Sequence, residues 1–423
     1  MNQILDIVSA VIFALTFIWL LGRPVAVLLN ALYSRKGQKQ IEYTSEPVVI
    51  DGVSVIVPCH NEAESIEETV LSLLSQKLDW PMELILIENN SSDHTLPVIE
   101  ALAEKYPQVV AASKRTPLGL NPISYSLNYG LTLCKYPIVV RIDADTKLAN
   151  EYSILKAIEP VISGRAVTTA TNVRVLNLKE NVLTRLQAID YYLSMEMDRR
   201  SQRIYNGVLC CSGALQVFKL KDVLSIGGYN TNPNIGEDLE ITFRLHRLGK
   251  VEMTPEAVSY TDVPPTVKEL AKQRLWWMRI GIVTLFVHKK AIGNKNYGRK
   301  GMLGLVALPI KLVTTFQAFI GVFLKSASSV LLPQTKTLAD VLTSYAIFSG
   351  IQILIVIATI AIVAPVAYNK QGVEQWYLVP LFTLVYQPFL AVVRVWGVIQ
   401  ALALIVSSIR LVPNADEKEV RVH

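Results

Sequence analysis

Hydrophobic residues gather in long runs near both ends of the chain, while the middle alternates short apolar and polar segments. Residues 8–29 form an apolar run long enough to cross the roughly 30 Å hydrocarbon core of a bilayer as a helix. Three further runs of this kind span 302–324, 341–367 and 377–409. The last contains Pro388 and is either one tilted helix or a broken pair. The pattern predicts an N-terminal membrane helix, a polar domain and a group of C-terminal membrane helices.

Basic residues indicate which side of the membrane the polar domain occupies. Arg35, Lys36 and Lys39 follow the first apolar run, and a basic stretch at 289–300 precedes the second. Because Lys and Arg concentrate on the cytoplasmic side, the middle of the chain is expected in the cytoplasm and the N-terminus outside. A cleaved signal peptide would begin with a basic segment, which residues 1–6 lack.

The middle of the chain has the spacing of an α/β domain. Strand-like segments alternate with segments of helical periodicity, at 52–59, 63–76, 84–87, 93–105, 109–112, 121–134 and 138–142. This βαβ spacing predicts a mainly parallel sheet with helices on both faces. Ligands of such sheets bind beyond the carboxyl ends of the strands.

Polar residues follow three of the predicted strands, where a ligand is expected. They are His60 and Glu62 after the first strand, next to Pro58, then Glu88 and Asn90 after the second, and Asp143 and Asp145 after the fourth. No glycine-rich phosphate motif is present there, which excludes a dinucleotide enzyme or a P-loop NTPase. A D-x-D pair at a strand end supplies hard oxygen ligands for Mg²⁺ or Mn²⁺, although Asp after a strand is also a common turn residue.

Composition supports a membrane protein and argues against nucleic-acid binding. Hydrophobic residues make up 51% of the 423 residues and charged residues only 18%, against about a quarter in soluble domains. The 41 Lys and Arg exceed the 35 Asp and Glu by 6, and much of that surplus flanks the apolar runs. We interpret it as topology and contact with membrane lipid. The four cysteines have no CxxC spacing and are expected as reduced thiols.

Six segments, in order, resemble family 2 of the glycosyltransferases, whose catalytic domain has the GT-A fold. They are VSVIVPCHNEAESIEETVLSLLSQ, LILIENNSSDHT, SLNYGL, VVRIDADT, SGALQVFKLKDVLSIGGY and GEDLEITFRLHRLG, within roughly 53–279. The resemblance implies an α/β GT-A domain, which is a Rossmann-like nucleotide-sugar-binding fold, in the cytoplasm, together with transmembrane helices. It also implies a bacterial-type plasma membrane as the location.

The resemblance assigns the strand-end residues to the donor side of a transfer reaction. A nucleotide-sugar, expected to be UDP-linked, would be bound by Pro58, His60, Glu62, Glu88, Asn90 and Asp143. Asp145, with Asp143 beside it, would hold the Mg²⁺ or Mn²⁺ that bridges the diphosphate. Glu88 and Asn89 depart from the double-Asp form common in the family.

The Glu237-Asp238 pair corresponds to the family's E-D motif. Asp238 would be the general base that takes the proton of the acceptor hydroxyl in an inverting displacement, and Glu237 would stand beside it. The alternative is that both carboxylates only favour the start of a helix through its dipole.

Two other groups of residues have patterns that argue against a site. His60, His94 and His246 have no metal-ligand spacing and are expected in surface or capping roles. The run from Cys210 to Gly213 lacks a nucleophile elbow, and its small residues are interpreted as space for the acceptor.

Residues 266–287 read as an amphipathic helix at the membrane surface. Within it the chain resembles membrane-embedded polysaccharide synthases of the family, such as hyaluronan, chitin, cellulose and poly-N-acetylglucosamine synthases, which carry Q-x-x-R-W here. Gln273 and Trp277 match, but Trp276 replaces the arginine. We assign the acceptor and diphosphate side to this helix, with Arg274 or Arg279 as the replacement charge.

These observations divide the chain into four expected parts: a membrane helix with a basic flank (1–46), a GT-A domain (47–265), an interfacial helix region (266–301) and C-terminal membrane helices (302–423). The leading function is an inverting transferase that extends a polysaccharide, with accessory or export subunits as candidate partners. One alternative adds a single sugar to a polyprenyl phosphate or another lipid. The other is an inactive scaffold that binds nucleotide-sugar. Lys311 and Arg394, inside the apolar runs, are candidates to line a polymer path, with the alternative that Lys311 lies on an interfacial helix and not within a span.

Overall fold

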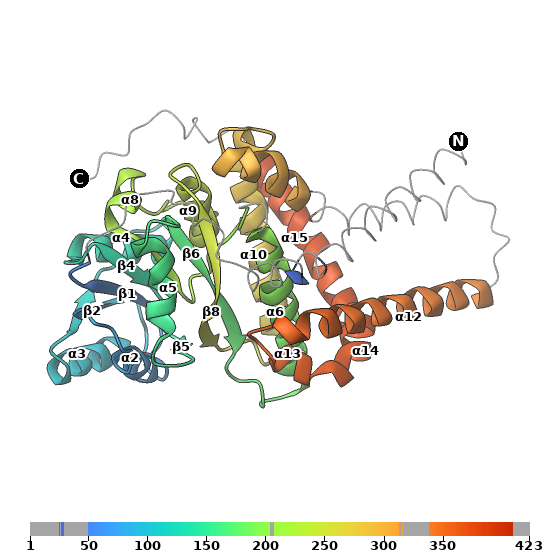
Figure 1. Ribbon diagram of the computed structural model, residues 1–423, viewed down its shortest axis with the longest axis horizontal. Helices are drawn as coiled ribbons and strands as arrows, with labels where there is room; N and C mark the ends of the chain where they lie inside the picture. The colour runs from blue at the N-terminus through green and yellow to red at the C-terminus, as the bar shows by residue number, and fades with distance from the viewer. Residues whose placement is uncertain are drawn as a thin grey trace.

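The structure is a computed structural model that describes residues 50–203, 207–312 and 338–408, together with residues 25, 27, 28 and 315. An eight-stranded sheet forms its centre, in the strand order β3-β2-β1-β4-β7-β6-β8-β5. Figure 1 shows this sheet with helices on both of its faces and a group of long helices beside it. The architecture is therefore the α/β class that the sequence predicts.

The first four strands run parallel, as the βαβ spacing predicts. They are β1 (Val53–Cys59), β2 (Met82–Glu88), β3 (Val109–Ser113) and β4 (Ile138–Arg141). The other strands are β5 (Lys147–Leu148), β6 (Thr168–Val175), β7 (Gln216–Lys219) and β8 (Val251–Thr261). Because β7 pairs antiparallel with both β4 and β6, the sheet as a whole is mixed.

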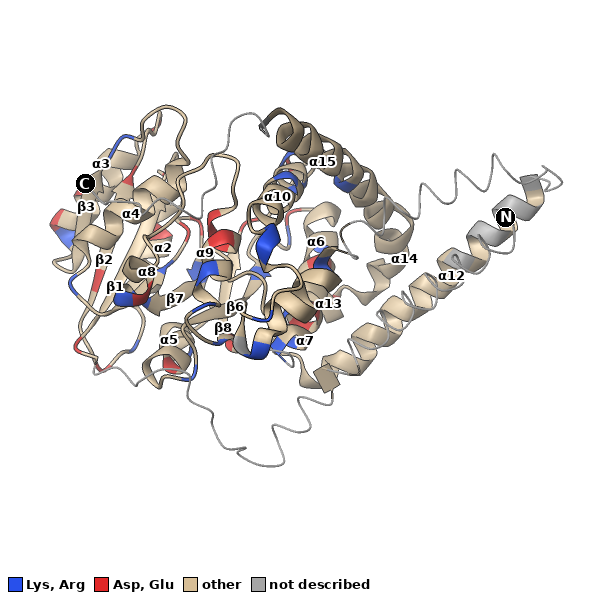
Figure 2. Cartoon of the chain, turned by 90° about the horizontal axis from the view of Figure 1, so that it is seen from above, with Lys and Arg blue, Asp and Glu red and all other residues tan. Residues whose placement is uncertain are grey.

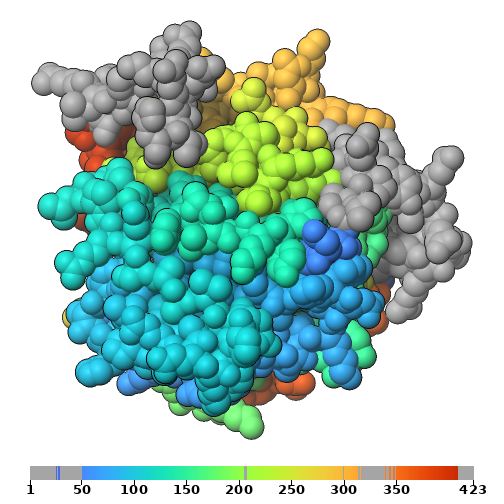
Figure 3. Space-filling view, turned by 90° about the vertical axis from the view of Figure 1, so that its left-hand side faces the viewer, coloured from blue at the N-terminus to red at the C-terminus, as the bar shows by residue number. Residues whose placement is uncertain are grey.

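Two helical layers cover the sheet. One face carries α2 (Ile66–Leu74), α3 (Thr95–Lys105) and α5 (Ser153–Ile162), and the other carries α4 (Pro122–Leu133), α8 (Leu220–Ser225) and α9 (Glu237–Leu245). Successive strand residues enter different cores, as a period of two requires. Leu84 and Leu86 pack in the first core, whereas Ile85 and Ile87 pack in the second. Figure 3 views the molecule from the left-hand side of Figure 1, and the blue-to-green first half of the sheet domain makes up most of the lower part of this face.

The long helices form a third region beside the sheet. It contains α6 (Val182–Tyr192), a π-helix (Leu193–Arg199), α7 (Arg200–Gln202), α10 (Val267–Val287), α12 (Leu338–Val363), α13 (Gln371–Glu374) and α15 (Gln387–Ser408). The helix predicted at 266–287 is present as α10, whose N-cap is Thr266. Figures 1 and 2 both show α15 beside α10. A Cβ added at Gly397 would lie 2.8 Å from Met278 Cβ, so the two helices approach closely because position 397 is glycine.

Two helical stretches of the described residues are long and apolar enough to cross a membrane, judged by length and composition. They are Ser349–Val366 and Trp376–Ser407. Figure 1 shows α12 projecting away from the rest of the molecule, and Figure 2 shows few charges on it. The second stretch is one helical run in which a π-turn, Phe382–Tyr386, immediately precedes Gln387 and Pro388. Pro388 therefore does not separate it into two helices.

The other two predicted spans lie largely or partly outside the described residues. The run at 8–29 lies outside the described residues except at positions 25, 27 and 28. The run at 302–324 is described to residue 312 and at residue 315, and Leu303–Leu312 is a short apolar helix.

A buried carboxylate ties the C-terminal helices to the sheet domain. Glu196, in the π-helix, is fully buried and accepts hydrogen bonds from Arg200 Nη1 (2.6 Å) and Asn172 Nδ2 (2.7 Å). The same side chain accepts from the backbone N–H groups of Tyr368 (3.0 Å) and Asn369 (2.6 Å), in the loop after α12. We call this arrangement the Glu196 latch. It places the loop 364–371 against the sheet domain.

Candidate active site

The strand-end residues singled out from the sequence lie at one edge of the sheet. In the parallel register Cys59 is opposite Glu88, so the loops that follow β1 and β2 start at the same level. The fourth strand ends at Arg141, and Asp143 and Asp145 follow it directly. The strands therefore bring the predicted donor and metal residues together.

Hydrogen bonds cross-link the loops after β1 and β2. Asn61 and Asn90 both have left-handed backbones, with φ of 58° and 55°, a region in which asparagine is tolerated better than most residues. The Asn61 side-chain oxygen accepts from Ser92 N at 2.8 Å, and the backbone N–H of Asn61 donates to Ser91 Oγ at 3.1 Å. Asn90 is exposed on the second loop. The two loops thus form one rigid rim.

The His60 ring joins this rim. Its Nδ1 lies 2.7 Å from the Asn89 carbonyl oxygen, which can only accept, so Nδ1 carries a hydrogen. Its Nε2 lies 3.3 Å from Asn61 Nδ2 and accepts from it. Pro58, opposite Ile87, lies beyond Ile56, the last residue of β1 that pairs with β4. Pro58 has no N–H to contribute to that ladder.

Glu88 and Asn89 have mainly architectural contacts. The Glu88 carboxylate is buried and accepts from Ser91 N and Ser113 Oγ, both at 2.6 Å. Burial raises its pKa, but these hydrogen bonds outweigh burial and leave the pKa below its usual value. The Asn89 amide donates to Thr116 Oγ1, the Pro122 carbonyl and Ser126 Oγ. It fastens the second loop to the start of α4.

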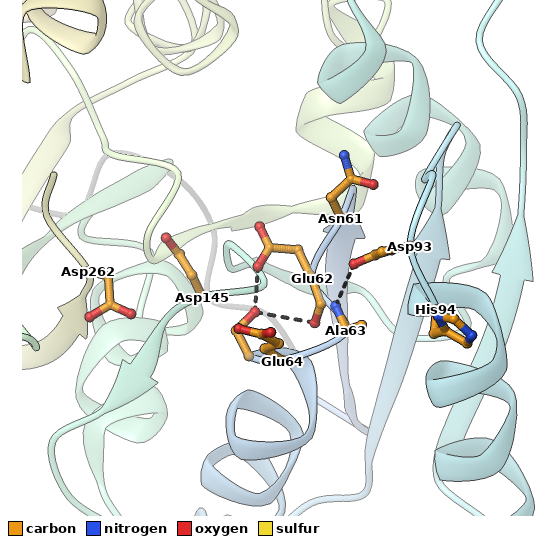
Figure 4. A pocket seen from close by; sticks show the side chains of 9 residues that line it. Asn61, Glu62, Ala63, Glu64, Asp93, His94, Asp145 and Asp262 are labelled. Atoms are coloured by element: carbon orange, nitrogen blue, oxygen red, sulfur yellow. Dashed lines mark hydrogen bonds between the residues drawn. The ribbon is translucent and has the colours of Figure 1, made fainter. Parts of the chain in front are cut away.

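A cavity of about 510 Å³ opens beside this rim. It is lined by Asn61, Glu62, Ala63, Glu64, Ser65, Asp93, His94, Asp145 and Asp262. Figure 4 shows Glu62 between Asp145 and Asp93, with Asp262 on the far side of Asp145. Burial, reinforced by the charges of Asp143 and Asp93, raises the pKa of Glu62. The cavity is thus strongly acidic and suited to a cation.

The D-x-D carboxyls have raised pKa values. Burial raises the pKa of Asp143 to about 6, with Arg141 opposing the rise and Asp145 adding to it. The Asp143 side chain is nevertheless 41% exposed, so part of the carboxylate remains open to solvent. Burial and the charge of Glu62 raise the pKa of Asp145 to about 6, although it accepts hydrogen bonds from Thr146 and Thr261. Both carboxyls lack enough positive charge nearby to offset their desolvation.

The donor set suits a hard divalent cation that shares its ligands with a substrate. Among the described residues, no three His, Cys, Asp or Glu side chains are grouped to hold an ion by themselves. Mg²⁺ sites usually take only one or two protein carboxylates and complete the shell with water and phosphate oxygens. Asp145 fits that arrangement, since it lines the acidic cavity and its charge acts on the nearby carboxylate of Asp143.

The Glu237-Asp238 pair lies in the first turn of α9, and Asp238 is held by two donors. Asp238 Oδ1 accepts from Leu239 N at 2.7 Å, and Oδ2 accepts from the Cys210 thiol at 3.3 Å. The position favours negative charge through the helix dipole, as the alternative interpretation holds. It also fixes the orientation of the carboxylate that the family resemblance assigns as the base.

The structure adds a residue that the sequence analysis missed. Arg141 is buried, and its Nη2 donates to Glu237 Oε1 at 2.7 Å and lies 3.4 Å from Asp143 Oδ1. Burial raises the pKa of Glu237, and the ion pair with Arg141 opposes that rise. The available signal was an arginine inside an apolar strand, because a buried charge needs a partner. Arg141 joins the D-x-D residues to the E-D motif.

The residues of α10 predicted to bind the acceptor and diphosphate make two kinds of contact, stacking of arginine on tryptophan and ion pairing. Arg274 lies 4.4 Å above the Trp277 ring and 3.1 Å from Asp190 Oδ2, so its charge is already paired. Arg279 lies 4.6 Å above the Trp276 ring. Gln273 Oε1 is buried without a hydrogen-bond partner. The structure therefore brings Arg279 and both tryptophans to this helix surface but commits Arg274 to Asp190.

The same helix contacts the E-D motif. A Cβ added at Gly236, the N-cap of α9, would lie 3.1 Å from Ile280 Cδ1, and Gly236 N donates to Thr284 Oγ1 at 3.3 Å. Trp277 lies three residues before Ile280 and therefore on the same side of α10. Its indole, 43% exposed, is one helical turn from the residues beside Asp238.

The structure corrects one histidine and describes the cysteines. His246, expected in a surface or capping role, is buried, and its Nε2 donates to the Val208 carbonyl at 2.7 Å. Burial lowers its pKa to about 4. His246 is the C-cap residue of α9, so it has the capping position that was one of the two expected roles, but its ring lies in the interior and not at the surface. His94 lies at the N-cap of α3 without a capping side-chain bond. All four cysteines are free.

Comparison with known proteins identifies the family. The family model described as "Glycosyltransferase like family 2" matches residues 51–279, more than half of the chain. The chain belongs to this family. It is thus a family 2 glycosyltransferase, and the resemblance in the sequence is confirmed.

Relatives of known function cover the same region. The poly-beta-1,6-N-acetyl-D-glucosamine synthase of Staphylococcus aureus (strain COL) is 29% identical over 235 residues, which cover 55% of this chain and 55% of that protein. The synthase of the same name from Staphylococcus epidermidis is 28% identical over 240 residues, 56% of each chain. The chain thus spans about half the length of the curated relatives it matches.

Similarity of structure extends further along the chain. The mannosyltransferase PcManGT from Pyrobaculum calidifontis, solved in complex with GDP-Man and Mn²⁺, superposes with a TM-score of 0.60. The superposition covers 93% of this chain and 98% of that one, at 18% sequence identity. This similarity shows that the chain has the GT-A fold.

Proposed function

We propose that this family 2 glycosyltransferase transfers a sugar from a UDP-linked donor to a growing polysaccharide by a single inverting displacement at the cytoplasmic face of a membrane. The observation that carries the proposal is the proximity of three carboxylates: the charges of Asp145 and Asp238 both act on Asp143. Arg141 in turn links Asp143 to Glu237, the neighbour of Asp238. A protein that only bound nucleotide-sugar would not need a carboxylate oriented toward an acceptor.

The donor side follows from the rim and the acidic cavity. The loops that carry His60, Glu88 and Asn90 would enclose the nucleoside, and their cross-links hold them in place without the ligand. Asp143 and Asp145 would hold a divalent metal, whose positive charge stabilises the diphosphate leaving group. The mannosyltransferase of similar fold was solved with Mn²⁺, which makes this ion the first choice for a test.

The acceptor side follows from α9 and α10. Asp238 takes the proton of the acceptor hydroxyl while that oxygen forms a bond to the anomeric carbon, and the bond from this carbon to the diphosphate oxygen breaks. Leu239 N and the Cys210 thiol hold the Asp238 carboxylate in place for this proton transfer. Trp277, one turn from Ile280, offers an exposed ring on which a sugar can stack. The names of the staphylococcal relatives support a polysaccharide acceptor.

The test uses the full-length chain, purified in nanodiscs with Mn²⁺ and a panel of radiolabelled UDP-sugars, with GDP-mannose included. A water-soluble ladder of products, sized on a gel, is the expected result. Asp238→Asn should reduce transfer by at least about a hundredfold, the range typical of a lost general base, while nucleotide binding persists. Asp222→Asn, which alters a carboxylate in the first turn of α8, is the matched control and should stay active.

Other outcomes would contradict the proposal. A single labelled species that extracts into organic solvent would replace the polymer with a lipid-linked product. Nucleotide binding without turnover from any donor would contradict transferase function. Full activity in Asp238→Asn would remove this residue from its role as base.

A second function is favoured by one observation on α10. Polysaccharide synthases of the family carry an arginine where this chain has Trp276, and Arg274 is paired with Asp190 and stacked on Trp277. Without that arginine, the site resembles one that releases its product after a single transfer. The alternative is a non-processive transfer to a polyprenyl phosphate or another lipid acceptor, and product length separates the two.

A further inference from the structure

Arg141 occupies a position from which it contacts both halves of the site. Its side chain is 2% exposed, and a single nitrogen, Nη2, faces Glu237 Oε1 at 2.7 Å and Asp143 Oδ1 at 3.4 Å. The first distance is that of a short, charge-assisted hydrogen bond, whereas the second is at the limit of hydrogen bonding. Glu237 therefore holds the guanidinium more firmly, and Asp143 shares it weakly.

The surrounding residues restrict the position of the Arg141 side chain. A Cβ added at Gly213 would lie 2.3 Å from Arg141 Nη2 and 2.9 Å from Asp143 Oδ1, so only glycine allows the two side chains to approach there. The Tyr229 ring lies 5.9 Å from the guanidinium carbon on another side. Arg141 is thus confined by packing as well as by charge.

We propose that Arg141 is a positioning residue whose charge is shared between Asp143 and Glu237, so that donor loading and the orientation of the E-D motif are coupled. The proposal rests on the proposed function, in which Asp143 belongs to the donor and metal side and Glu237 to the acceptor side. Glu237 holds the guanidinium away from Asp143 and leaves the Asp143 carboxylate available to the metal and donor. If metal and donor bind to Asp143, the Arg141 guanidinium would pair with Glu237 alone.

Coupling of this kind is reciprocal. If a change at Glu237 alters the affinity for metal and nucleotide, then metal and nucleotide alter the state of Glu237 by the same free energy. The contact between Glu237 and Arg141 would then depend on whether metal and donor are bound at Asp143.

A double-mutant cycle tests the coupling through binding and does not depend on turnover. Mn²⁺–UDP dissociation constants are measured by calorimetry for the full-length wild type, Glu237→Gln, Arg141→Met and the double variant. Glu237→Gln lies outside the metal site but releases the guanidinium to Asp143, so it should weaken Mn²⁺–UDP binding by about fivefold or more. In the Arg141→Met background, the same Glu237→Gln change should alter the constant by less than about twofold.

A second ion pair on the same helix provides the matched control. Arg244 Nη2 lies 2.6 Å from Glu240 Oε2, also buried, but this pair does not contact Asp143. Glu240→Gln should leave the Mn²⁺–UDP constant within about twofold of wild type. Should Arg141→Met not fold, Arg141→Gln takes its place in the cycle, because its amide keeps a neutral donor beside Glu237.

The outcomes separate this proposal from the proposed function. An equal effect of Glu237→Gln with and without Arg141, or no effect in the wild-type background, overturns the coupling. An effect of Glu240→Gln as large as that of Glu237→Gln also overturns it, since the response would then be a general property of α9. Absence of transfer from any donor would contradict the proposed function and leave the binding cycle interpretable.

Discussion

Asn89 shows how a single side chain can depart from a family pattern for a structural reason. The family commonly has aspartate at this position, and its replacement leaves the residue's ligand contacts open in the sequence. In the structure Asn89 Nδ2 lies within hydrogen-bond distance of the Pro122 carbonyl and of the Thr116 and Ser126 hydroxyls. The hydroxyls can donate as well as accept, but the carbonyl can only accept, so an amide suits the contact with the start of α4 and a carboxylate does not. Such a requirement is invisible in sequence because Thr116, Pro122 and Ser126 lie at least 27 positions away.

We expect Asn89→Asp to destabilise the protein. The carboxylate would face the Pro122 carbonyl without a hydrogen between them, and a buried unsatisfied group of this kind costs about 1–3 kcal/mol. Thermal unfolding of the purified chain should show a Tm lower by several degrees. Asn90→Asp, at an exposed left-handed position that tolerates aspartate, is the control and should leave the Tm unchanged. Equal Tm values for the two variants would contradict the architectural role of Asn89.

The D-x-D carboxyls predict how donor binding depends on pH. Asp143 and Asp145 both have a pKa raised to about 6, and a metal must displace their protons. Affinity for Mn²⁺ with a UDP-sugar should therefore fall as the pH drops through about 6, by about tenfold or more between pH 7 and pH 5. Calorimetry on Asp238→Asn, in which turnover is suppressed, measures this. A dissociation constant that is independent of pH would contradict it.

The same raised pKa values have the opposite effect on the stability of the metal-free fold, which they increase at low pH. A folded pKa above the unfolded value of about 4 means that protons stabilise the native state. This contribution is complete below about pH 4 and is lost as the pH rises through about 6. Mn²⁺ with donor should thus raise the Tm more at pH 7 than at pH 5.

At the scale of elements, the sequence predicts the first half of the sheet well and the second half poorly. Strands β1 to β4 and helices α2 to α4 follow from apolar periods and turn residues, and the structure has all of them within a few residues of the expected bounds. Beyond Arg141 the signal weakens because β6 is rich in buried polar residues. Thr169 donates to Ala157 O, and Thr171 donates to Leu215 O, so their polarity is satisfied by distant partners. Hydropathy alone does not reveal such a strand.

The N-terminus of α6 provides a prediction at this scale. Asn181 Oδ1 accepts from Thr184 N at 3.0 Å in a capping box, and its Nδ2 donates to Pro265 O at 2.9 Å. Asn181→Ala should destabilise the protein by about 1–2 kcal/mol, because it removes the cap and the link to the start of α10. Thermal unfolding beside Asn296→Ala, which changes an exposed asparagine, measures the difference. A Tm as high as that of Asn296→Ala would show that the cap is unimportant.

At the scale of the whole molecule, the candidate spans and the sheet domain are connected by the loop 364–371. With its 26 residues, α12 extends about 39 Å, enough to cross a hydrocarbon core of roughly 30 Å. Its C-terminal end meets the sheet domain through the Glu196 latch. If α12 spans the membrane, its two ends lie on opposite sides. The sequence predicts the apolar run but not this attachment, because the groups that hold the loop, such as Glu196 and Val175, lie more than 160 positions away in the sequence.

Labelling of introduced cysteines tests this topology. In a background without the four native cysteines, Ala339→Cys at the start of α12 should react with a membrane-impermeant maleimide in intact cells. Lys370→Cys, exposed in the loop beside the sheet domain, should react only after the cells are permeabilised. Reaction of both positions in intact cells, or of neither, would contradict a spanning α12.

The Glu196 latch limits how the catalytic domain can be isolated. Shortening the chain after α10, the usual route to a water-soluble fragment, would remove two of the four donors to the Glu196 carboxylate. It would also uncover the apolar surface of α6 that now packs against Ile360 and Phe382. A soluble fragment would therefore need Glu196 and its neighbours redesigned together. Detergent-solubilised full-length protein is the better starting material for crystallisation and cryo-electron microscopy.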